Sequence, residues 1–107
     1  MSIPKRLSNI YEELKGGFGV VLGLPITDEF IHYHPSSLAE RFIQPLSGKV
    51  PRFYHVVAAT SASISDEQFV LIRNSWGPDW GINGYAYLSH EYIENAVTDA
   101  YRVTVSR

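Results

Sequence analysis

Cysteine is absent from all 107 residues of the chain. This absence excludes disulfide bonds, and it excludes a thiolate nucleophile supplied by the chain itself. A reducing compartment is therefore permitted. No signal-peptide core follows residues 1–6, so the compartment is left open and the sequence favours the cytoplasm.

Long hydrophobic runs and a strong charge of either sign are absent as well. No apolar run approaches the roughly 18–20 residues that a membrane-spanning helix needs, so we expect no membrane partner. The chain carries 9 Lys and Arg against 11 Asp and Glu, with a formal net charge of -2, and its basic residues are scattered. Nucleic acid is therefore not expected as a partner.

The composition suits one compact domain. Apolar residues make up 45% of the chain and aromatic residues 13%. A domain between 60 and 150 residues buries roughly 60–70% of the surface that its unfolded chain exposes, so one core is feasible. We therefore expect residues 1–107 to form a single domain.

Local patterns predict a helix near the N-terminus, followed by strands. The hydroxyl of Ser8 can cap a helix over residues 8–15, which the two glycines that follow would end. A continuous apolar run over 18–24, bounded by Gly17 and Pro25, favours a buried strand. Four more strand-like segments are separated by turn-rich stretches: 53–59, 68–73, 84–88 and 100–106. The pattern predicts an α+β fold with a mostly antiparallel, partly closed β-sheet or barrel.

The most informative segment covers residues 73–85 and reads RNSWGPDWGINGY. It contains Asn74 and Trp76, and a histidine, His55, stands upstream at the start of an apolar strand. Together these features resemble the asparagine-bearing segment and the catalytic histidine of papain-like cysteine peptidases. The resemblance covers roughly the whole chain, and residues 91–103 are similar to the ending of bacterial members.

The resemblance implies roles for three residues. His55 would be the general base, Asn74 would accept a hydrogen bond from its imidazole, and Trp76 would cover that bond from water. In this chemistry a thiolate attacks the carbonyl, an imidazolium stabilises the thiolate and protonates the leaving amine, and an amide holds the ring. Trp76 and Trp80 also suit a hydrophobic core, and we keep that interpretation for much of the Trp80 ring.

The resemblance also implies that the chain is one half of such an enzyme, the right-hand lobe of a papain-like fold. In papain-like enzymes the histidine and asparagine follow the nucleophilic cysteine by about 130–150 residues. Only 54 residues precede His55. We therefore expect the Cys-bearing lobe to be supplied elsewhere, in the same natural chain or by another one, and the isolated chain to be inactive.

Two classes of function stay open. In the first, the chain is the His- and Asn-bearing half of a peptidase that acts on a peptide or protein. In the second, it is a non-catalytic papain-like module that binds a peptide or protein. The apolar cleft face that the missing lobe would cover has to be buried by something, so we expect a protein partner or self-association through that face.

No cofactor or metal is expected. His32 and His34 have the spacing of two strand residues on one face, but no third ligand is evident near them, and His90 with Glu91 lacks support as well. The glycines between residues 73 and 85 do not form a phosphate loop, because the Lys-Ser/Thr ending and a following helix are missing.

Overall fold

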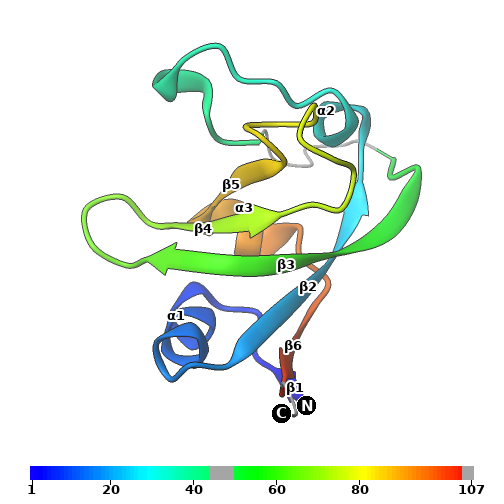
Figure 1. Cartoon of the computed structure of the whole chain (residues 1–107). Helices are drawn as coiled ribbons and strands as arrows, with labels where there is room; N and C mark the ends of the chain where they lie inside the picture. Colours follow the sequence, from blue (N-terminus) through cyan, green and yellow to red (C-terminus); the bar gives the residue numbers. More distant parts are fainter. Residues whose placement is uncertain (44–49, 105–107) are drawn as a thin grey trace.

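The computed structural model describes residues 1–43 and 50–104 of the chain (Figure 1). In this part six strands form one sheet in the order β1-β6-β2-β3-β4-β5, and all neighbouring strands run antiparallel. The strands are β1 (Ser2–Ile3), β2 (Gly19–Ile26), β3 (Phe53–Ser63), β4 (Phe69–Arg73), β5 (Tyr85–Ser89) and β6 (Asp99–Val103). The predicted mostly antiparallel sheet is confirmed.

The sheet is open, and the expected partial closure into a barrel is not seen. Strands β1 and β5 lie at opposite ends of the strand order. The register between β3 and β4 shifts between Ala59 and Ser61, and such an irregularity bends a strand without joining the edges of a sheet. An edge strand of two residues, as β1 is, also offers too little backbone to close a barrel.

Four helical segments accompany the sheet in the described residues: α1 (Leu7–Lys15), α2 (Asp28–Ile31), the 3-10 helix η1 (Leu38–Glu40) and α3 (His90–Asn95). No helix in these residues has the length and apolar character that crossing a membrane requires.

Helix α1 begins one residue earlier than predicted. Leu7 and Ile10 are 3% and 0% exposed, and Arg6 occupies the N-cap position without a side-chain cap. The predicted capping role of Ser8 is therefore wrong, because burial of Leu7 draws that residue into the first turn and leaves Ser8 exposed within the helix. The predicted end is confirmed, since Gly17 adopts the left-handed φ of 88° that glycine tolerates.

The hydrophobic core lies between the helices α1 and α3 and one face of the sheet, which we call the inner face. Ile10 of α1 and Ile93 of α3 are fully buried together with Leu22 of β2 and Ile72 of β4. Burying one such side chain stabilises the fold by about 1.5–3 kcal/mol. Residues that alternate with these on the strands, such as Val56, remain exposed on the opposite face, which we call the outer face.

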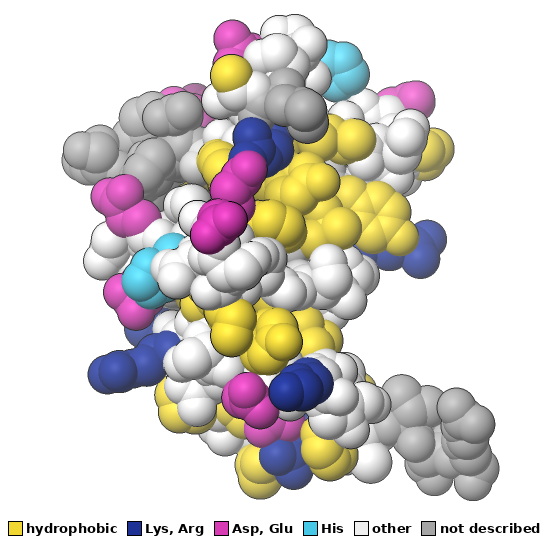
Figure 2. Space-filling model, turned by 90° about the vertical axis from the view of Figure 1, so that its left-hand side faces the viewer, with side chains coloured by type: hydrophobic (Ala, Val, Ile, Leu, Met, Phe, Trp, Pro, Cys, Tyr) yellow, Lys and Arg dark blue, Asp and Glu magenta, His cyan; other side chains and the backbone are white. Residues whose placement is uncertain are grey.

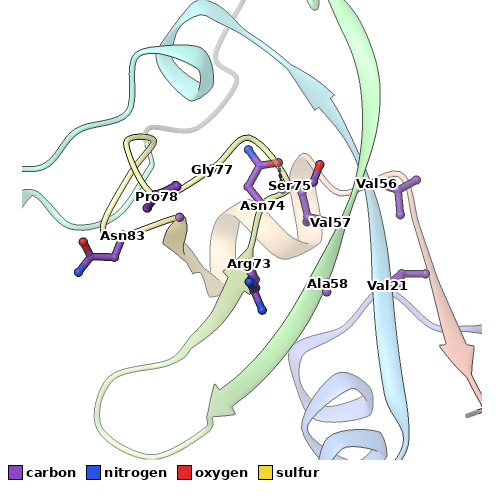
Figure 3. A pocket seen from close by; sticks show the side chains of 11 residues that line it. Val21, Val56, Val57, Ala58, Arg73, Asn74, Ser75, Gly77, Pro78 and Asn83 are labelled. Carbon is purple, nitrogen blue, oxygen red and sulfur yellow. Dashed lines mark hydrogen bonds between the residues drawn. The ribbon is translucent and has the colours of Figure 1, made fainter.

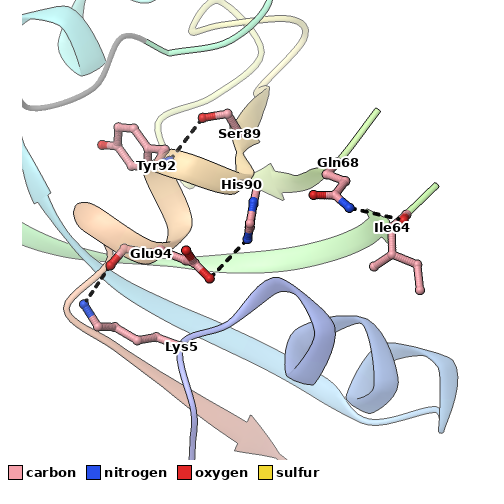
Figure 4. A network of polar contacts seen from close by, with 7 residues as sticks. All are labelled: Lys5, Ile64, Gln68, Ser89, His90, Tyr92 and Glu94. Carbon is pink, nitrogen blue, oxygen red and sulfur yellow. Dashed lines mark hydrogen bonds and ion pairs between the residues drawn. The ribbon is translucent and has the colours of Figure 1, made fainter. Parts of the chain in front are cut away.

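Helix α3 has no counterpart among the predicted elements, and tertiary contacts hold it. The Ser89 hydroxyl accepts the Tyr92 backbone N–H at 3.1 Å, which caps the first turn. Figure 4 shows the ammonium of Lys5 reaching the carbonyl oxygen of Glu94, at 3.3 Å, while His90 pairs with the Glu94 carboxylate at 3.1 Å. A helix of six residues is too short to show a clear sequence period.

A group of half-buried aromatic rings lies beside the β4–β5 pair. The ring centres of Phe69 and Tyr87 are 5.1 Å apart, and Phe42 lies 6.2 Å from Tyr87. The Arg41 guanidinium lies 4.7 Å from the centre of the Phe42 ring and forms an ion pair with Glu67. Figure 2 shows hydrophobic side chains of this side of the molecule with charged side chains lying beside them. Arg41 and its partner Glu67 thus cover part of this group of aromatic rings.

A bidentate ion pair ties α1 to β6. The Nε and Nη2 atoms of Arg102 donate to the two carboxylate oxygens of Glu13 at 2.6 and 2.8 Å, and the guanidinium lies 4.1 Å from the centre of the Phe18 ring. The hydrogen bond from Arg102 lowers the pKa of Glu13 below its ordinary value of 4.5. A lowered folded-state pKa means that the ionised carboxylate stabilises the folded chain.

We predict that Glu13→Gln lowers the free energy of unfolding at neutral pH and that the difference from the unsubstituted chain disappears in acid. The stabilisation is fully present above the unfolded pKa of Glu13 and is lost as the pH falls through its lower folded pKa. Urea unfolding between about pH 7 and about pH 2 measures this. Glu12→Gln on the same helix is the matched control, and an equal effect of both variants at every pH would contradict the prediction.

A second prediction concerns Tyr92, which is 0% exposed and whose hydroxyl has no hydrogen-bond partner among the described residues. Burial raises the pKa of Tyr92 to about 12. Because an unpaired buried hydroxyl costs about 1–3 kcal/mol, Tyr92→Phe should raise the free energy of unfolding by about 1 kcal/mol. Tyr33→Phe should lower it by a similar amount, since the Tyr33 hydroxyl donates to the Arg41 carbonyl oxygen. Urea midpoints that move in the same direction for both variants would refute the argument.

Candidate active site

The pairing of β3 with β4 brings His55 and Asn74 together. Ala58 of β3 lies opposite Arg73, the last residue of β4, so the residue after Arg73 meets the first half of β3. The His55 Nε2 and Asn74 Oδ1 atoms are 2.9 Å apart. The structure therefore contains the hydrogen bond between His55 and Asn74 that the family resemblance implied.

The orientation of the Asn74 amide is fixed by its neighbours. Its backbone N–H donates to the Gly84 carbonyl at 2.9 Å, and the Ser75 backbone N–H donates to Oδ1 at 2.8 Å. An atom that receives a backbone N–H is an acceptor, so it is the amide oxygen, and His55 Nε2 must carry the proton that completes the bond. In the neutral imidazole, Nδ1 is then the nitrogen that lacks a hydrogen and can accept one.

Left-handed backbone shapes the loop that follows Asn74. Gly81 has a φ of 59°, and a Cβ atom at this position would lie 2.5 Å from the Tyr85 carbonyl oxygen. Gly84, whose carbonyl accepts the Asn74 N–H, has a φ of 91°. Only glycine adopts this combination without strain, so these two glycines let the loop return to the sheet beneath Asn74.

Trp76 lies over the imidazole. Its ring stacks on that of His55 with centres 5.1 Å apart and an interplanar angle of 20°. It also meets Phe30 edge-on, with ring centres 5.5 Å apart, while 37% of the residue remains exposed. The Trp76 ring thus covers one face of the His55 imidazole. That it keeps water away from the His55–Asn74 hydrogen bond stays a prediction.

Phe30 supports both tryptophans and was not singled out from the sequence. Its ring centre lies 4.8 Å from that of Trp80, and its carbonyl oxygen accepts the Trp80 Nε1–H at 2.8 Å. Trp80 is 8% exposed, which agrees with the core position expected for much of its ring. No local signal marks Phe30, because its partners lie 46 or more residues away in the chain.

Two hollows adjoin the paired side chains. One, of about 730 Å³, is lined by Arg73 and Asn74 and, across from them, by Val56 and Ala58 of β3 (Figure 3). The other, of about 630 Å³, is lined by His55 and Val56 together with Gly23, Leu24, Tyr54, Thr98 and Asp99. The imidazole therefore borders open space.

The histidines considered as metal ligands are not assembled into a metal site. Within residues 1–43 and 50–104, no group of three or more His, Cys, Asp or Glu side chains is arranged to hold a metal ion. His32 and His34 line a shared hollow with Glu29 and Glu40, whereas His90 pairs with Glu94 in α3.

The imidazole of His55 can accept and donate a proton, but the chain contains no thiol that could give it one. Ser75 carries its hydroxyl on the same loop as Asn74, and only its backbone N–H takes part in orienting the amide. The site therefore combines a hydrogen-bonded imidazole and amide in a chain without cysteine.

Comparison with known proteins relates most of the chain to one family. The family model described as papain family cysteine protease matches residues 9–104. The uncharacterized peptidase C1-like protein L477 of Acanthamoeba polyphaga mimivirus is 28% identical over 105 residues, which are 92% of this chain and 32% of that protein. The thiol protease aleurain-like protein of Arabidopsis thaliana is 33% identical over 76 residues, 69% of this chain and 21% of that protein. The chain thus spans about a third or less of these relatives.

Solved structures show the same fold. Xylellain, a cysteine protease from Xylella fastidiosa, superposes with a TM-score of 0.74 at 20% identity, over 97% of this chain and 38% of that one. The bromelain protease from Ananas comosus superposes with a TM-score of 0.65 at 15% identity, over 97% of this chain and 49% of that one.

We predict that the neutral His55 ring is protonated at Nε2 and that this proton exchanges slowly with water. Asn74→Ala should remove the protected proton, because the acceptor is lost. Nitrogen-15 NMR of the imidazole measures the protonation of each ring nitrogen, and the exposed His34 is the internal reference. A His55 ring protonated mainly at Nδ1, or a proton equally protected in Asn74→Ala, would contradict this assignment.

Proposed function

The chain belongs to the papain family of cysteine proteases, and we propose that it is the His- and Asn-bearing half of a peptidase whose thiol nucleophile comes from elsewhere. The observation that carries the proposal is the 2.9 Å bond between His55 and Asn74, under the Trp76 ring, in a chain that contains no cysteine. In this proposal the isolated chain is inactive.

The geometry supports a division of labour in peptide-bond hydrolysis. His55 Nδ1 accepts the proton of the supplied thiol, and the resulting thiolate attacks the scissile carbonyl carbon. The imidazolium then gives the proton to the leaving amine, and the acyl group is left on sulfur until water releases it. Asn74 keeps Nε2–H directed at its own Oδ1 throughout, so Nδ1 stays turned toward the nucleophile.

A Cys-bearing half is the partner that this chemistry requires, in the same natural chain or in another one. The length of the relatives supports this, because this chain covers 32% of the mimivirus protein and 38% of xylellain. A peptide or protein is then the substrate of the completed site.

A non-catalytic binding module is the second candidate. Tyr54 and Val56, which line the hollow next to His55, are 70% and 59% exposed. Apolar side chains that border a hollow favour peptide binding whether or not a nucleophile is present.

We predict that the isolated chain hydrolyses neither peptides nor esters and is not modified by thiol-directed reagents, since no residue is cysteine. Turnover of a fluorogenic peptide, measured after a second purification, checks this. Robust turnover that survives repurification and vanishes in Asn74→Ala would point to another nucleophile at this site.

Joining the chain to the Cys-bearing segment of a papain family member separates the two candidates. The peptidase proposal expects hydrolysis, with His55→Ala lowering kcat/KM by at least about a hundredfold, the effect of removing a general base. Ser75→Ala is the matched control, because the backbone N–H that contacts Asn74 is retained. Peptide binding without hydrolysis in a folded fusion would favour the binding module.

A further inference from the structure

A tight two-residue turn leads into β5. The Ile82 backbone N–H donates to the Tyr85 carbonyl oxygen at 2.9 Å, and the Tyr85 N–H donates to the Ile82 carbonyl oxygen at 3.0 Å. Asn83 and Gly84 occupy the two central positions, with φ angles of 53° and 91°. Hairpin turns with positive φ at both central positions strongly favour the sequence Asn-Gly. The backbone conformation of this turn therefore selects this dipeptide.

The same dipeptide is open to spontaneous deamidation, because asparagine is a thermolabile residue and glycine has no side chain to shield its nitrogen. In this reaction the Gly84 backbone nitrogen loses its proton, bonds to the Asn83 Cγ atom and expels ammonia. A succinimide ring closes, and water then opens it at either of its carbonyl carbons. One opening leaves aspartate. The other leaves isoaspartate, in which the main chain runs through the former side chain.

Asn83 lies where this reaction can proceed. The residue is exposed, and Figure 3 shows its side chain at the edge of the large hollow, pointing away from Asn74. Each of the other three asparagines is followed by a residue with a side chain, and Asn74 is also buried. These pairs are Asn9-Ile10, Asn74-Ser75 and Asn95-Ala96. Asn83 is therefore the asparagine of this chain that is most open to deamidation.

The hydrogen bonds of the turn restrain the reaction while the turn is closed. The Gly84 N–H donates to the Trp80 carbonyl oxygen at 2.8 Å. A nitrogen whose proton is held in this way cannot lose it and attack, so conversion requires the turn to open. Exposed turns and loops of folded proteins open locally at a small cost in free energy. The rate of conversion in the folded chain is then set by how often this turn opens.

Gly84 also connects the turn to the candidate active site. Its carbonyl oxygen accepts the Asn74 backbone N–H at 2.9 Å. A Cβ atom added to Gly84 would lie 3.3 Å from the Gly77 carbonyl oxygen, so the backbone is closely surrounded here. Isoaspartate adds a carbon atom to the main chain directly before Gly84. The longer chain displaces the carbonyl that anchors Asn74, and with it the amide that orients His55.

We propose that Asn83 is a site of spontaneous modification, and that its conversion to isoaspartate loosens the anchor of Asn74 and releases the His55 imidazole. The inference does not depend on hydrolysis by the site, because it rests on the geometry of the turn and on its hydrogen bond to Asn74. The turn that returns the chain to the sheet thereby also limits the lifetime of the oriented His55–Asn74 pair.

Incubation of the folded 107-residue chain at mildly alkaline pH tests the modification. Peptide mapping by mass spectrometry, with synthetic aspartate and isoaspartate peptides as standards, measures conversion at each asparagine. Asn95 is the internal control, because it is exposed and the Ala96 N–H that follows it also donates to a backbone carbonyl at 2.8 Å. Asn83 should convert at least about tenfold faster, which corresponds to about 1.4 kcal/mol in activation free energy. Absence of conversion at Asn83, or equal rates at both positions, would overturn the proposal.

Nitrogen-15 NMR of the separated isoaspartate form tests the consequence for His55. The protected Nε2 proton should be lost, while the core amides of Leu22 and Ile72 stay protected, which separates local release from unfolding of the chain. Asn83→Asp is the matched control, since it carries the new charge without the longer main chain, and it should keep the proton.

Asn83→Gly tolerates the positive φ and has no amide to react, so it should keep the His55 proton throughout the same incubation. Protection of His55 that is unchanged in the isoaspartate form would overturn the link between the turn and the site. The same conclusion would follow if Asn83→Asp lost the proton equally, or if the isoaspartate form lost protection across the core.

Discussion

The antiparallel pairing of β3 with β2 and β4 is the constraint on which both faces of the molecule depend. Side chains alternate along β3, so His55, Val57 and Ala59 turn inward while Val56 and Ala58 turn outward. A shift of one residue would exchange the two sets. The same register that buries the core therefore sets the imidazole beside Asn74 and leaves an apolar row on the outer face.

Polar burial explains why the site is ordered in a chain that has no nucleophile. Asn74 is only 5% exposed, and its oxygen satisfies two donors, from Ser75 and His55. A buried oxygen is stabilised by such partners, so the fold itself maintains the bond between the two side chains, whereas the buried Nδ2 atom of Asn74 has no partner among the described residues. Trp76 stacks on the His55 ring and packs edge-on against Phe30 of α2. Neither feature requires a thiol, so the His55–Asn74 pair can be ordered in a chain that contains no cysteine.

The sequence predicted the strands well where apolar runs are bounded by glycine, proline or polar turns. Strand β4 matches its predicted segment within one residue, and β2 extends past Pro25 to Ile26 because these two residues are buried and pair with β3. The part of the predicted strand 100–106 that follows Thr104 lies outside the described residues. Short elements were missed. The two-residue β1, for example, pairs with β6 from the far end of the chain, and two residues are too few to show a local period.

The sequence by itself determined that this chain can supply a histidine and an asparagine but never a thiol, because composition and the motif around Asn74 are properties of the chain alone. It also determined the family, through the run of tryptophan and glycine after Asn74. Only the tertiary structure decided that Nε2 of His55 faces Oδ1 of Asn74, that Phe30 supports Trp76, and that Arg73 lies beside Ala58 on the outer face. Each of these depends on contacts between residues far apart in the chain, whose distances are fixed by strand register and packing and leave no local pattern in the sequence.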